Sequence, residues 1–188
     1  LDYCATTPTD PRVVEAMLPW FYENPGNASS KNHVFGWRTE SAVENAREQM
    51  SRLIGTTPHE ITFTSGATES INLAIKGIYQ AYSNKGNHII TCATEHKAVL
   101  DTCKQLEQFG AKITYLPVNK TGQIDLNQLD TSISDSTILV SIMMANNETG
   151  VIQPISQIAE IAHRHGIAFM SDATQAIGEI PVNVDEMG

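Results

Sequence analysis

Four short polar segments of this sequence carry side chains that could bind or activate a small charged molecule: residues 64–70, 94–97, 145–150 and 171–175. The first reads Thr-Ser-Gly-Ala-Thr-Glu-Ser, which is typical of a strand end, a glycine turn and a helix start. The first N–H groups of a helix lack acceptors within it and the helix dipole is positive there, so a phosphate could bind, with the Thr68 hydroxyl as a further donor. Capping of the helix by Thr68 or Ser65 would explain the same residues. The common nucleotide-binding loops, GxxxxGK[ST] and GxGxxG, are absent.

Each of the other three segments offers one polar side chain with a possible chemical role. His96 opens a predicted helix on the stripe that faces inward, so a buried structural histidine is the alternative to a functional one. Asn147 could present its amide to a ligand, although an Asn pair before a glycine is also typical of a turn. Asp172 ends a buried strand, where an unpaired carboxylate is costly, so we expect a cationic ring nitrogen, an arginine or a metal beside it, or a capping role. The absence of nearby His or Cys ligands disfavours the metal.

Strands and helices must alternate from residue 61 onward to position these segments. The pattern of apolar residues predicts strands at 61–64, 88–92, 112–118, 137–144 and 167–171, and helices at 67–82, 96–109, 126–133 and 155–165. Two further helices are predicted before them, at 11–22 and 42–54, the second ending at Gly55. This order predicts an α/β fold, a three-layer αβα arrangement with a mainly parallel central sheet. Ligands bind such sheets at the carboxyl ends of the strands, where all four polar segments lie.

Composition limits the class of protein. The chain has 188 residues, 41% hydrophobic and 18% charged, which suits one ordinary domain with a packed core. Its formal net charge of −9 argues against a nucleic-acid binder, which requires a clustered basic face. The longest apolar stretch, residues 138–145, is too short to span a bilayer, and no export signal opens the chain. Cys4, Cys92 and Cys103 lie far apart without zinc-ligand spacing, which predicts reduced thiols in the cytoplasm.

Taken in series, these motifs resemble those of the pyridoxal-phosphate-dependent cysteine desulfurases of the IscS/NifS type, which belong to the fold-type-I superfamily. The resemblance spans essentially the whole chain in the right order, and it looks closer to the IscS-like branch than to the selenocysteine-lyase-like branch. Three motifs in series, Ser-Gly-Ala-Thr-Glu-Ser, Thr-Glu-His-Lys and Asp-Ala-Thr-Gln, make it highly specific. The residues that carry it are 1–8, Gly26, Asn27, Ser30, His33, 64–70, 94–100, 146–148 and 172–175.

The resemblance implies a pyridoxal 5'-phosphate site. It implies that the backbone N–H of Ala67 and the hydroxyl of Thr68 hold the cofactor phosphate. Asp172 would pair with the pyridine nitrogen and keep it protonated, so that the ring can act as an electron sink. Gln175 would donate a hydrogen bond to the phenolic oxygen of the ring.

The resemblance also implies the reaction and the residues around the substrate. His96 would stack on the pyridine ring and take part in proton transfer, as the catalytic residue of this stretch. Asn147 would lie near the phenolic oxygen and bind the substrate carboxylate, and residues 5–6 would line the substrate side. The implied activity transfers sulfur from L-cysteine to an enzyme cysteine, which becomes a persulfide, and releases L-alanine. This sulfur would supply iron–sulfur clusters and thio-cofactors.

The resemblance further implies that parts of the machinery lie outside these residues. The family's cofactor-binding lysine, its persulfide-forming cysteine and its carboxylate-binding arginine would all lie beyond Gly188. We therefore expect residues 1–12 to be a segment near the substrate site, and residues 13–188 to be part of the cofactor-binding large domain, incomplete at its C-terminal side. Such an N-terminal fragment would be inactive alone. The implied partners are a second copy in a homodimer and sulfur-acceptor or iron–sulfur scaffold proteins, with no nucleic acid and no membrane.

Two other interpretations stay open from the sequence. The chain could belong to another fold-type-I lyase or aminotransferase that acts on a different amino acid. It could also be a non-catalytic scaffold that retains the fold. A cysteine in the downstream loop would favour sulfur transfer, and the lack of a Ser-x-His-Lys segment would favour the scaffold.

Overall fold

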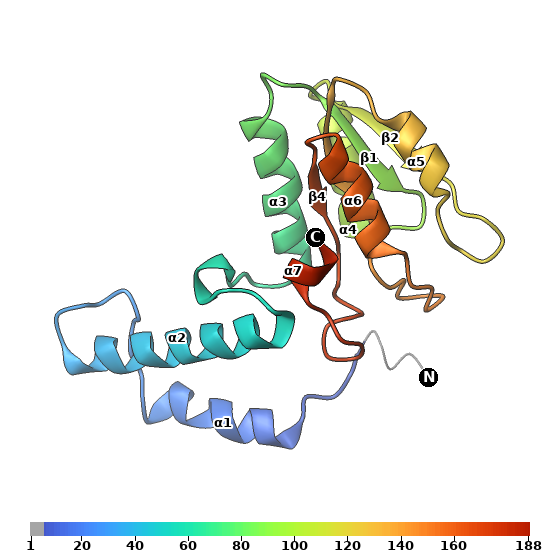
Figure 1. Ribbon diagram of the computed structural model, residues 1–188. Helices are drawn as coiled ribbons and strands as arrows, with labels where there is room; N and C mark the ends of the chain where they lie inside the picture. The colour runs from blue at the N-terminus through green and yellow to red at the C-terminus, as the bar shows by residue number, and fades with distance from the viewer. Residues whose placement is uncertain (1–5) are drawn as a thin grey trace. The chain divides into compact units, whose positions relative to one another are not determined.

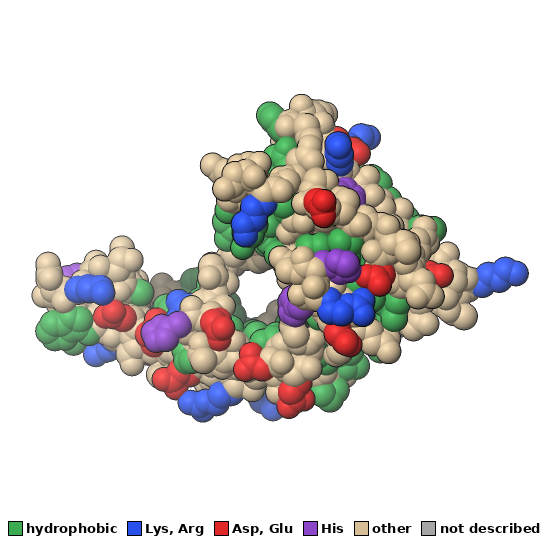
Figure 2. Space-filling view, turned by 45° about the horizontal axis from the view of Figure 1, so that its top comes forward, with side chains coloured by type: hydrophobic (Ala, Val, Ile, Leu, Met, Phe, Trp, Pro, Cys, Tyr) green, Lys and Arg blue, Asp and Glu red, His purple; other side chains and the backbone are tan. Residues whose placement is uncertain are grey.

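The computed structural model describes residues 6–188, and the chain forms two compact units that divide between Thr62 and Phe63 (Figure 1). Cys4 and Ala5, which belong to the segment expected near the substrate site, lie outside the described residues. Among the described residues, no helix combines the length and the apolar character needed to cross a membrane. On the face shown in Figure 2, acidic and basic side chains are interspersed among neutral ones.

The first unit consists of α1 (Pro11–Tyr22), α2 (Val34–Ile54) and the short 3-10 helix η1 (Pro58–Glu60). The bounds of α1 and the end of α2 at Gly55, which has a φ of 71°, are as predicted. However, α2 begins at Val34 rather than at residue 42. The ring of His33 caps it by accepting a hydrogen bond from Gly36 N at 3.2 Å, so the helix extends beyond its apolar stripe.

The second unit is built on a four-stranded sheet with the order β2-β1-β3-β4, and every neighbouring pair is parallel. This arrangement confirms the predicted α/β fold. The strands are shorter than predicted at several ends, and only β1 has the expected bounds. The elements of this unit are α3 (Ala67–Ala81), β1 (His88–Cys92), α4 (Lys97–Glu107), β2 (Lys112–Leu116), α5 (Leu126–Ser132), β3 (Thr137–Ser141), α6 (Ile155–Arg164), β4 (Ala168–Met170) and α7 (Val184–Met187).

Helices cover both faces of this sheet (Figure 1). On one face, which we call the α3/α4 face, side chains of the two helices pack on Ile89 and Leu139. On the other, the α5/α6 face, side chains of those helices pack on Ile90 and Val140. The alternation of neighbouring strand residues between the two faces is the physical basis of the three layers, because a parallel sheet must be covered on both sides.

The strand predicted at residues 61–64 is not formed. A strand requires a neighbour for its backbone N–H and C=O groups, and within residues 6–188 no strand pairs with this segment. The guanidinium of Arg47 donates a hydrogen bond to the carbonyl of Ile61. The apolar pattern of this segment is therefore not sufficient to make it a strand.

Candidate functional site

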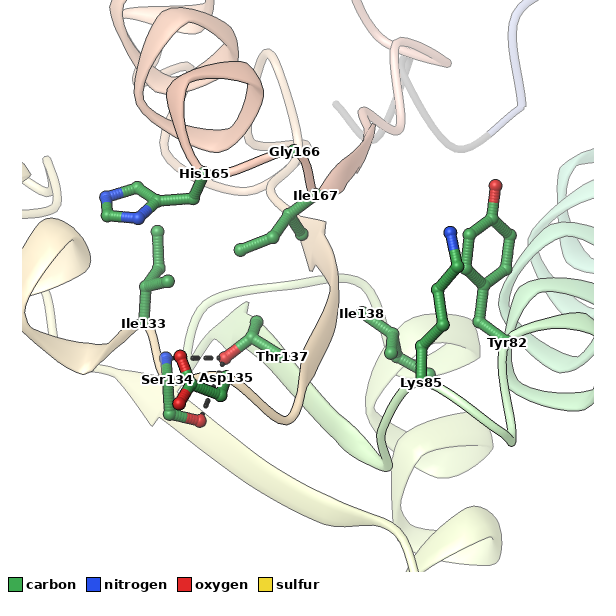
Figure 3. Close-up of a pocket in the computed structure, with 10 residues that line it drawn as sticks. All are labelled: Tyr82, Lys85, Ile133, Ser134, Asp135, Thr137, Ile138, His165, Gly166 and Ile167. Carbon is green, nitrogen blue, oxygen red and sulfur yellow. Dashed lines mark hydrogen bonds between the residues drawn. The ribbon is translucent and has the colours of Figure 1, made fainter.

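The predicted site residues follow the carboxyl ends of β1, β3 and β4, which lie at one edge of the parallel sheet. The start of α3 points to the same edge. The other end of α3 shows this. Tyr82, which follows the last residue of the helix, lines a pocket with Thr137 and Ile167, and these two residues stand at the amino ends of β3 and β4 (Figure 3). Since α3 therefore runs antiparallel to the strands, its first residues lie toward their carboxyl ends.

The pocket in Figure 3 has a volume of about 460 Å³ and lies at the amino-terminal edge of the sheet. The ammonium of Lys85 lies 4.7 Å from the centre of the Tyr82 ring, and Thr137 Oγ1 accepts a hydrogen bond from Ser134 N at 2.9 Å. None of the site residues predicted from the sequence lines this pocket. The candidate site is therefore the edge of the sheet formed by the carboxyl ends of the strands, where the predicted site residues lie.

The turn before α3 presents backbone donors with no side-chain cap. Gly66 is the N-cap residue, has a φ of 155° and lacks a side chain, and a Cβ placed on it would meet nothing within 4 Å. Neither Thr68 nor Ser65 caps the helix, so the capping interpretation of these two residues is wrong. Within residues 6–188, the N–H groups of Ala67 and Thr68 have no acceptor, and both residues are exposed. An anion such as a phosphate fits this turn.

Glu69 holds the turn in place from within α3. Its Oε2 accepts hydrogen bonds from the backbone N–H and the hydroxyl of Ser65, both at 2.6 Å. The Ser65 hydroxyl, followed by its N–H, lowers the pKa of Glu69. The carboxylate thus fixes the residue that precedes the glycine, and leaves the N–H groups of Ala67 and Thr68 open.

His96 lies at a helix start, but it is not a buried histidine. It is the N-cap of α4, which begins at Lys97, and its Nδ1 accepts a hydrogen bond from Ala98 N at 3.1 Å. The ring is exposed, whereas Val99 and Cys103 on the predicted stripe are fully buried. The expectation that His96 faces inward is therefore wrong. Because Nδ1 accepts, the neutral ring carries its proton on Nε2.

The Asn pair forms a turn in which the two residues differ. Asn146 Oδ1 accepts hydrogen bonds from Glu148 N at 3.0 Å and Thr149 N at 2.9 Å, while its Nδ2 donates to Thr94 O at 2.9 Å. Asn147 is half-buried, and its Nδ2 donates to Glu148 Oε1 at 3.0 Å. Asn146 therefore makes the turn, and the Asn147 side chain takes no part in it beyond this neighbour contact.

Asp172 has one carboxylate oxygen in use and one available. Its Oδ1 accepts from Thr174 N at 3.0 Å and from Thr174 Oγ1 at 2.6 Å, which makes a turn rather than a helix cap. Across residues 6–188, no arginine, lysine or metal-binding cluster pairs with the half-buried carboxylate. Gln175 lies three residues further on and is half-buried. The second oxygen, Oδ2, fits a cationic partner from outside these residues.

Three hydrogen bonds join the loops that follow the strands. Met144 N donates to Asp172 O at 2.9 Å, and Asn146 Nδ2 donates to Thr94 O. Met143 N donates to Glu95 Oε1 at 2.8 Å. The loops that carry His96, Asn147 and Asp172 are therefore brought together, and the turn at Ala67 and Thr68 lies toward the same edge through the direction of α3.

Glu95 is a residue of this edge to which sequence reasoning assigned no role. It is only 6% exposed, and burial raises the pKa of its carboxyl group to about 8, with the nearby charge of Asp172 adding to the rise. Its position in the sequence is the signal that could have indicated a role. Glu95 stands between the end of an apolar strand and the start of a helix, and neither element requires a charged side chain there.

The two described cysteines are unsuited to nucleophilic attack. Cys92 and Cys103 are both free and buried. Burial raises the pKa of the Cys103 thiol to about 12, and the Cys92 sulfur lies 3.2 Å from Thr94 Oγ1. Both sulfur atoms are buried, and the reactive thiolate is disfavoured at Cys103, so these residues act as structural thiols.

The whole chain, residues 1–188, matches the aminotransferase class-V family. The chain belongs to this family. It is 57% identical to a cysteine desulfurase IscS of Rickettsia massiliae (strain Mtu5) over 99% of its own length, and 58% identical to one of Ehrlichia chaffeensis (strain ATCC CRL-10679 / Arkansas) over 100%. It covers 45% of each of these relatives, so it spans a little under half of their length.

Solved structures agree with this assignment to the class-V family. A NifS-like protein matches with a TM-score of 0.95 at 40% identity, over 99% of this chain and 51% of the other. The structure named SspA in complex with cysteine matches with a TM-score of 0.94 at 41% identity, over 99% and 53%. Class-V aminotransferases and IscS/NifS-like desulfurases depend on pyridoxal phosphate. The uncapped N–H groups after Gly66 and the available oxygen of Asp172 fit its phosphate and its ring nitrogen.

Proposed function

We propose that the full-length protein is a pyridoxal-phosphate-dependent cysteine desulfurase. It transfers sulfur from L-cysteine to one of its own cysteine thiols, which becomes a persulfide, and it releases L-alanine. The observation that carries this proposal is that two binding groups lie toward the same edge of the sheet. They are the open helix N–H groups at Ala67 and Thr68 and an available carboxylate oxygen of Asp172. The similarity to proteins named cysteine desulfurase IscS supports the choice of substrate.

In this proposal, the residues of the chain hold the cofactor at both ends. The N–H of Ala67 and the hydroxyl and N–H of Thr68 bind the phosphate, where the positive end of the α3 dipole favours it. Asp172 Oδ2 accepts from the protonated pyridine nitrogen, and this ion pair favours the charged form of both partners. When bound, the cofactor supplies an electron sink for the α-carbon of an amino acid. Gln175 donates to the phenolic oxygen of the ring.

Two further side chains act on the open side of the site. His96 stacks on the ring and holds a proton on Nε2, because Nδ1 is engaged by the Ala98 N–H. Asn147 binds the substrate carboxylate through its amide after its contact with Glu148 is exchanged. In this proposal, residues 13–188 belong to the cofactor-binding large domain.

The partners and location follow from the same proposal. The full-length protein forms a homodimer in the cytoplasm and passes its sulfur to acceptor or iron–sulfur scaffold proteins. Residues 1–188 alone, which span 45% of the desulfurase relatives, do not turn over L-cysteine. The cytoplasmic location follows from the spacing of the cysteines in the sequence, which predicts reduced thiols.

The experiment compares Asp172→Ala with Asp135→Ala in the full-length protein. Asp135 is a matched control because it lines the pocket at the opposite edge of the sheet. We expect Asp172→Ala to lose the visible absorbance of the cofactor and to slow alanine release from L-cysteine by roughly 100-fold or more. Asp135→Ala should keep both. Cofactor binding without alanine release would instead favour another lyase or an aminotransferase, and a wild-type protein that binds no cofactor would favour the scaffold.

A further inference from the structure

Glu95 is the carboxylate of the candidate site that the proposed function leaves without a role. It stands one residue before His96 and is 6% exposed. Its Oε1 accepts the hydrogen bond from Met143 N at 2.8 Å, which ties the loop after β1 to the residues after β3. Its Oε2 is buried and has no hydrogen-bond partner within residues 6–188.

The surroundings of Glu95 disfavour a charged carboxylate. Asp172 faces it from the end of β4, and Cys103 faces it from α4. Neither is a cation, and no ion pair involving Glu95 occurs in the described part of the chain. One backbone N–H is not enough to offset the burial, so the pKa of Glu95 is raised to about 8. This rise favours the uncharged carboxylic acid at neutral pH.

We propose that Glu95 is a positioning residue, which accepts from Met143 N to fix the loop of His96 against the loop of Asn147 and, as a neutral acid, leaves the negative charge of the site to Asp172. This inference rests on the proposed function for its meaning in catalysis. Its geometry does not depend on the cofactor, because the bond to Met143 N lies within the protein. The two carboxyl groups divide the roles between them: Asp172 supplies charge, and Glu95 supplies a hydrogen-bonded contact without charge.

A neutral acid and an amide have nearly the same shape, which gives the first arm of the test. In Glu95→Gln, the amide oxygen can accept from Met143 N as Oε1 does, whereas Glu95→Ala removes the contact. Glu107→Gln is the matched control, because Glu107 lies on α4 but is exposed. We expect Glu95→Ala to lower kcat for alanine release by ~10- to ~100-fold through misplacement of His96, and Glu95→Gln to recover most of that loss. Glu107→Gln should match the wild type.

Infrared spectroscopy of the cofactor-free full-length protein gives the second arm. We expect the carbonyl stretch of a protonated carboxylic acid at pH 7, its loss in Glu95→Gln, its retention in Glu107→Gln and its disappearance in the wild type as the pH rises through about 8. A third measurement is the visible spectrum of the bound cofactor, whose pH titration should contain a transition near 8 in the wild type that Glu95→Gln lacks.

Several results would overturn the proposal. They are the absence of the infrared band at neutral pH, a Gln variant as impaired as the Ala variant, or an Ala variant as active as the wild type. If Glu95→Ala does not fold, the infrared band and the Gln variant still decide. A wild-type protein that binds no cofactor would contradict the proposed function but would not affect the infrared measurement, which uses the cofactor-free protein. A failure of the proposed function can therefore be distinguished from a failure of this inference.

Discussion

Met144 N donates a hydrogen bond to Asp172 O at 2.9 Å, beyond the last paired residues of β3 and β4. The sheet pairing between these strands ends at Ser141 and Met170, and Ile142 N still bonds to Met170 O at 3.1 Å. The backbone at Asp172 is therefore fixed by the backbone of the segment that follows β3, not by side chains around it. A carboxylate that must meet a single atom of a ligand benefits from such a rigid base.

Replacing Gly66 tests the turn before α3. We expect Gly66→Ala to destabilise the protein by about 1 kcal/mol and to weaken phosphate binding, because a φ of 155° is unfavourable for alanine. Gly77→Ala is the control, since Gly77 lies inside α3 and a Cβ there also meets nothing within 4 Å. That variant should gain ~0.5–1 kcal/mol from helix propensity. Denaturant unfolding and cofactor titration provide the measurements, and a Gly66→Ala protein as stable as Gly77→Ala would contradict the expectation.

Thr174 orients the carboxylate of Asp172. Thr174→Val keeps the shape of the side chain but removes the 2.6 Å hydrogen bond from Oγ1 to Asp172 Oδ1. A bond to a charged group contributes about 1.5 kcal/mol or more, so we expect cofactor affinity to fall by roughly tenfold. Thr121→Val removes a similar bond, 2.7 Å long, to Asn119 Oδ1 in a loop between β2 and α5. Equal affinities of the two variants for the cofactor would show that Thr174 does not orient the site.

Glu69 should make the Ser65 turn sensitive to acid. The pKa of Glu69 is lowered in the folded protein, so its contribution is present above the ordinary value of 4.5 and is lost as the pH falls through the folded value. We expect hydrogen exchange at the Ser65 amide to be faster in Glu69→Gln than in the wild type at pH 7, because the amide accepts more weakly than a carboxylate. The Ser70 amide, which bonds to Gly66 O at 3.1 Å, serves as the internal reference. Unchanged exchange at Ser65 would refute this role of Glu69.

Glu95 should make the stability of the protein fall with rising pH. Its folded pKa of about 8 lies above the ordinary value of 4.5, so the folded state binds more protons than the unfolded state between these values. The free energy of unfolding therefore declines across this window, at up to ~1.4 kcal/mol per pH unit, and becomes flat above it. Glu95→Gln should remove this decline, as measured by urea unfolding from pH 5 to 9 in comparison with Glu107→Gln. A wild-type slope that persists in Glu95→Gln would assign the decline to other groups.

The sequence predicted most of the second unit, because its elements have simple local signals. The apolar runs of β1 and β3 and the amphipathic stripe of α6 are sufficient to place them. The prediction of a strand at residues 61–64 was wrong, because a strand requires a neighbouring strand, and a local pattern of apolar residues does not reveal whether one is present. Likewise, the first turns of α2 depend on the His33 cap rather than on an apolar stripe.

The candidate site was predicted as residue types at strand ends, and less well as environments. Asn147 and Asp172 are half-buried near the expected edge, but His96 is exposed, since its ring caps α4 instead of packing beneath it. The role of Glu95 depends on Met143 and Asp172, which are distant in sequence and meet it only in the folded chain. Pairwise contacts of this kind cannot be inferred from spacing along one sequence.

The bond between Met144 and Asp172 makes one backbone amide a natural reporter of the site. An amide that donates to the residue holding a ligand experiences any displacement of that residue, while its own side chain remains in the core. The chemical shift of the Met144 amide should thus change when a ligand binds to Asp172. Because Met144 is buried, this change reports on the bond to Asp172 and not on contact with solvent.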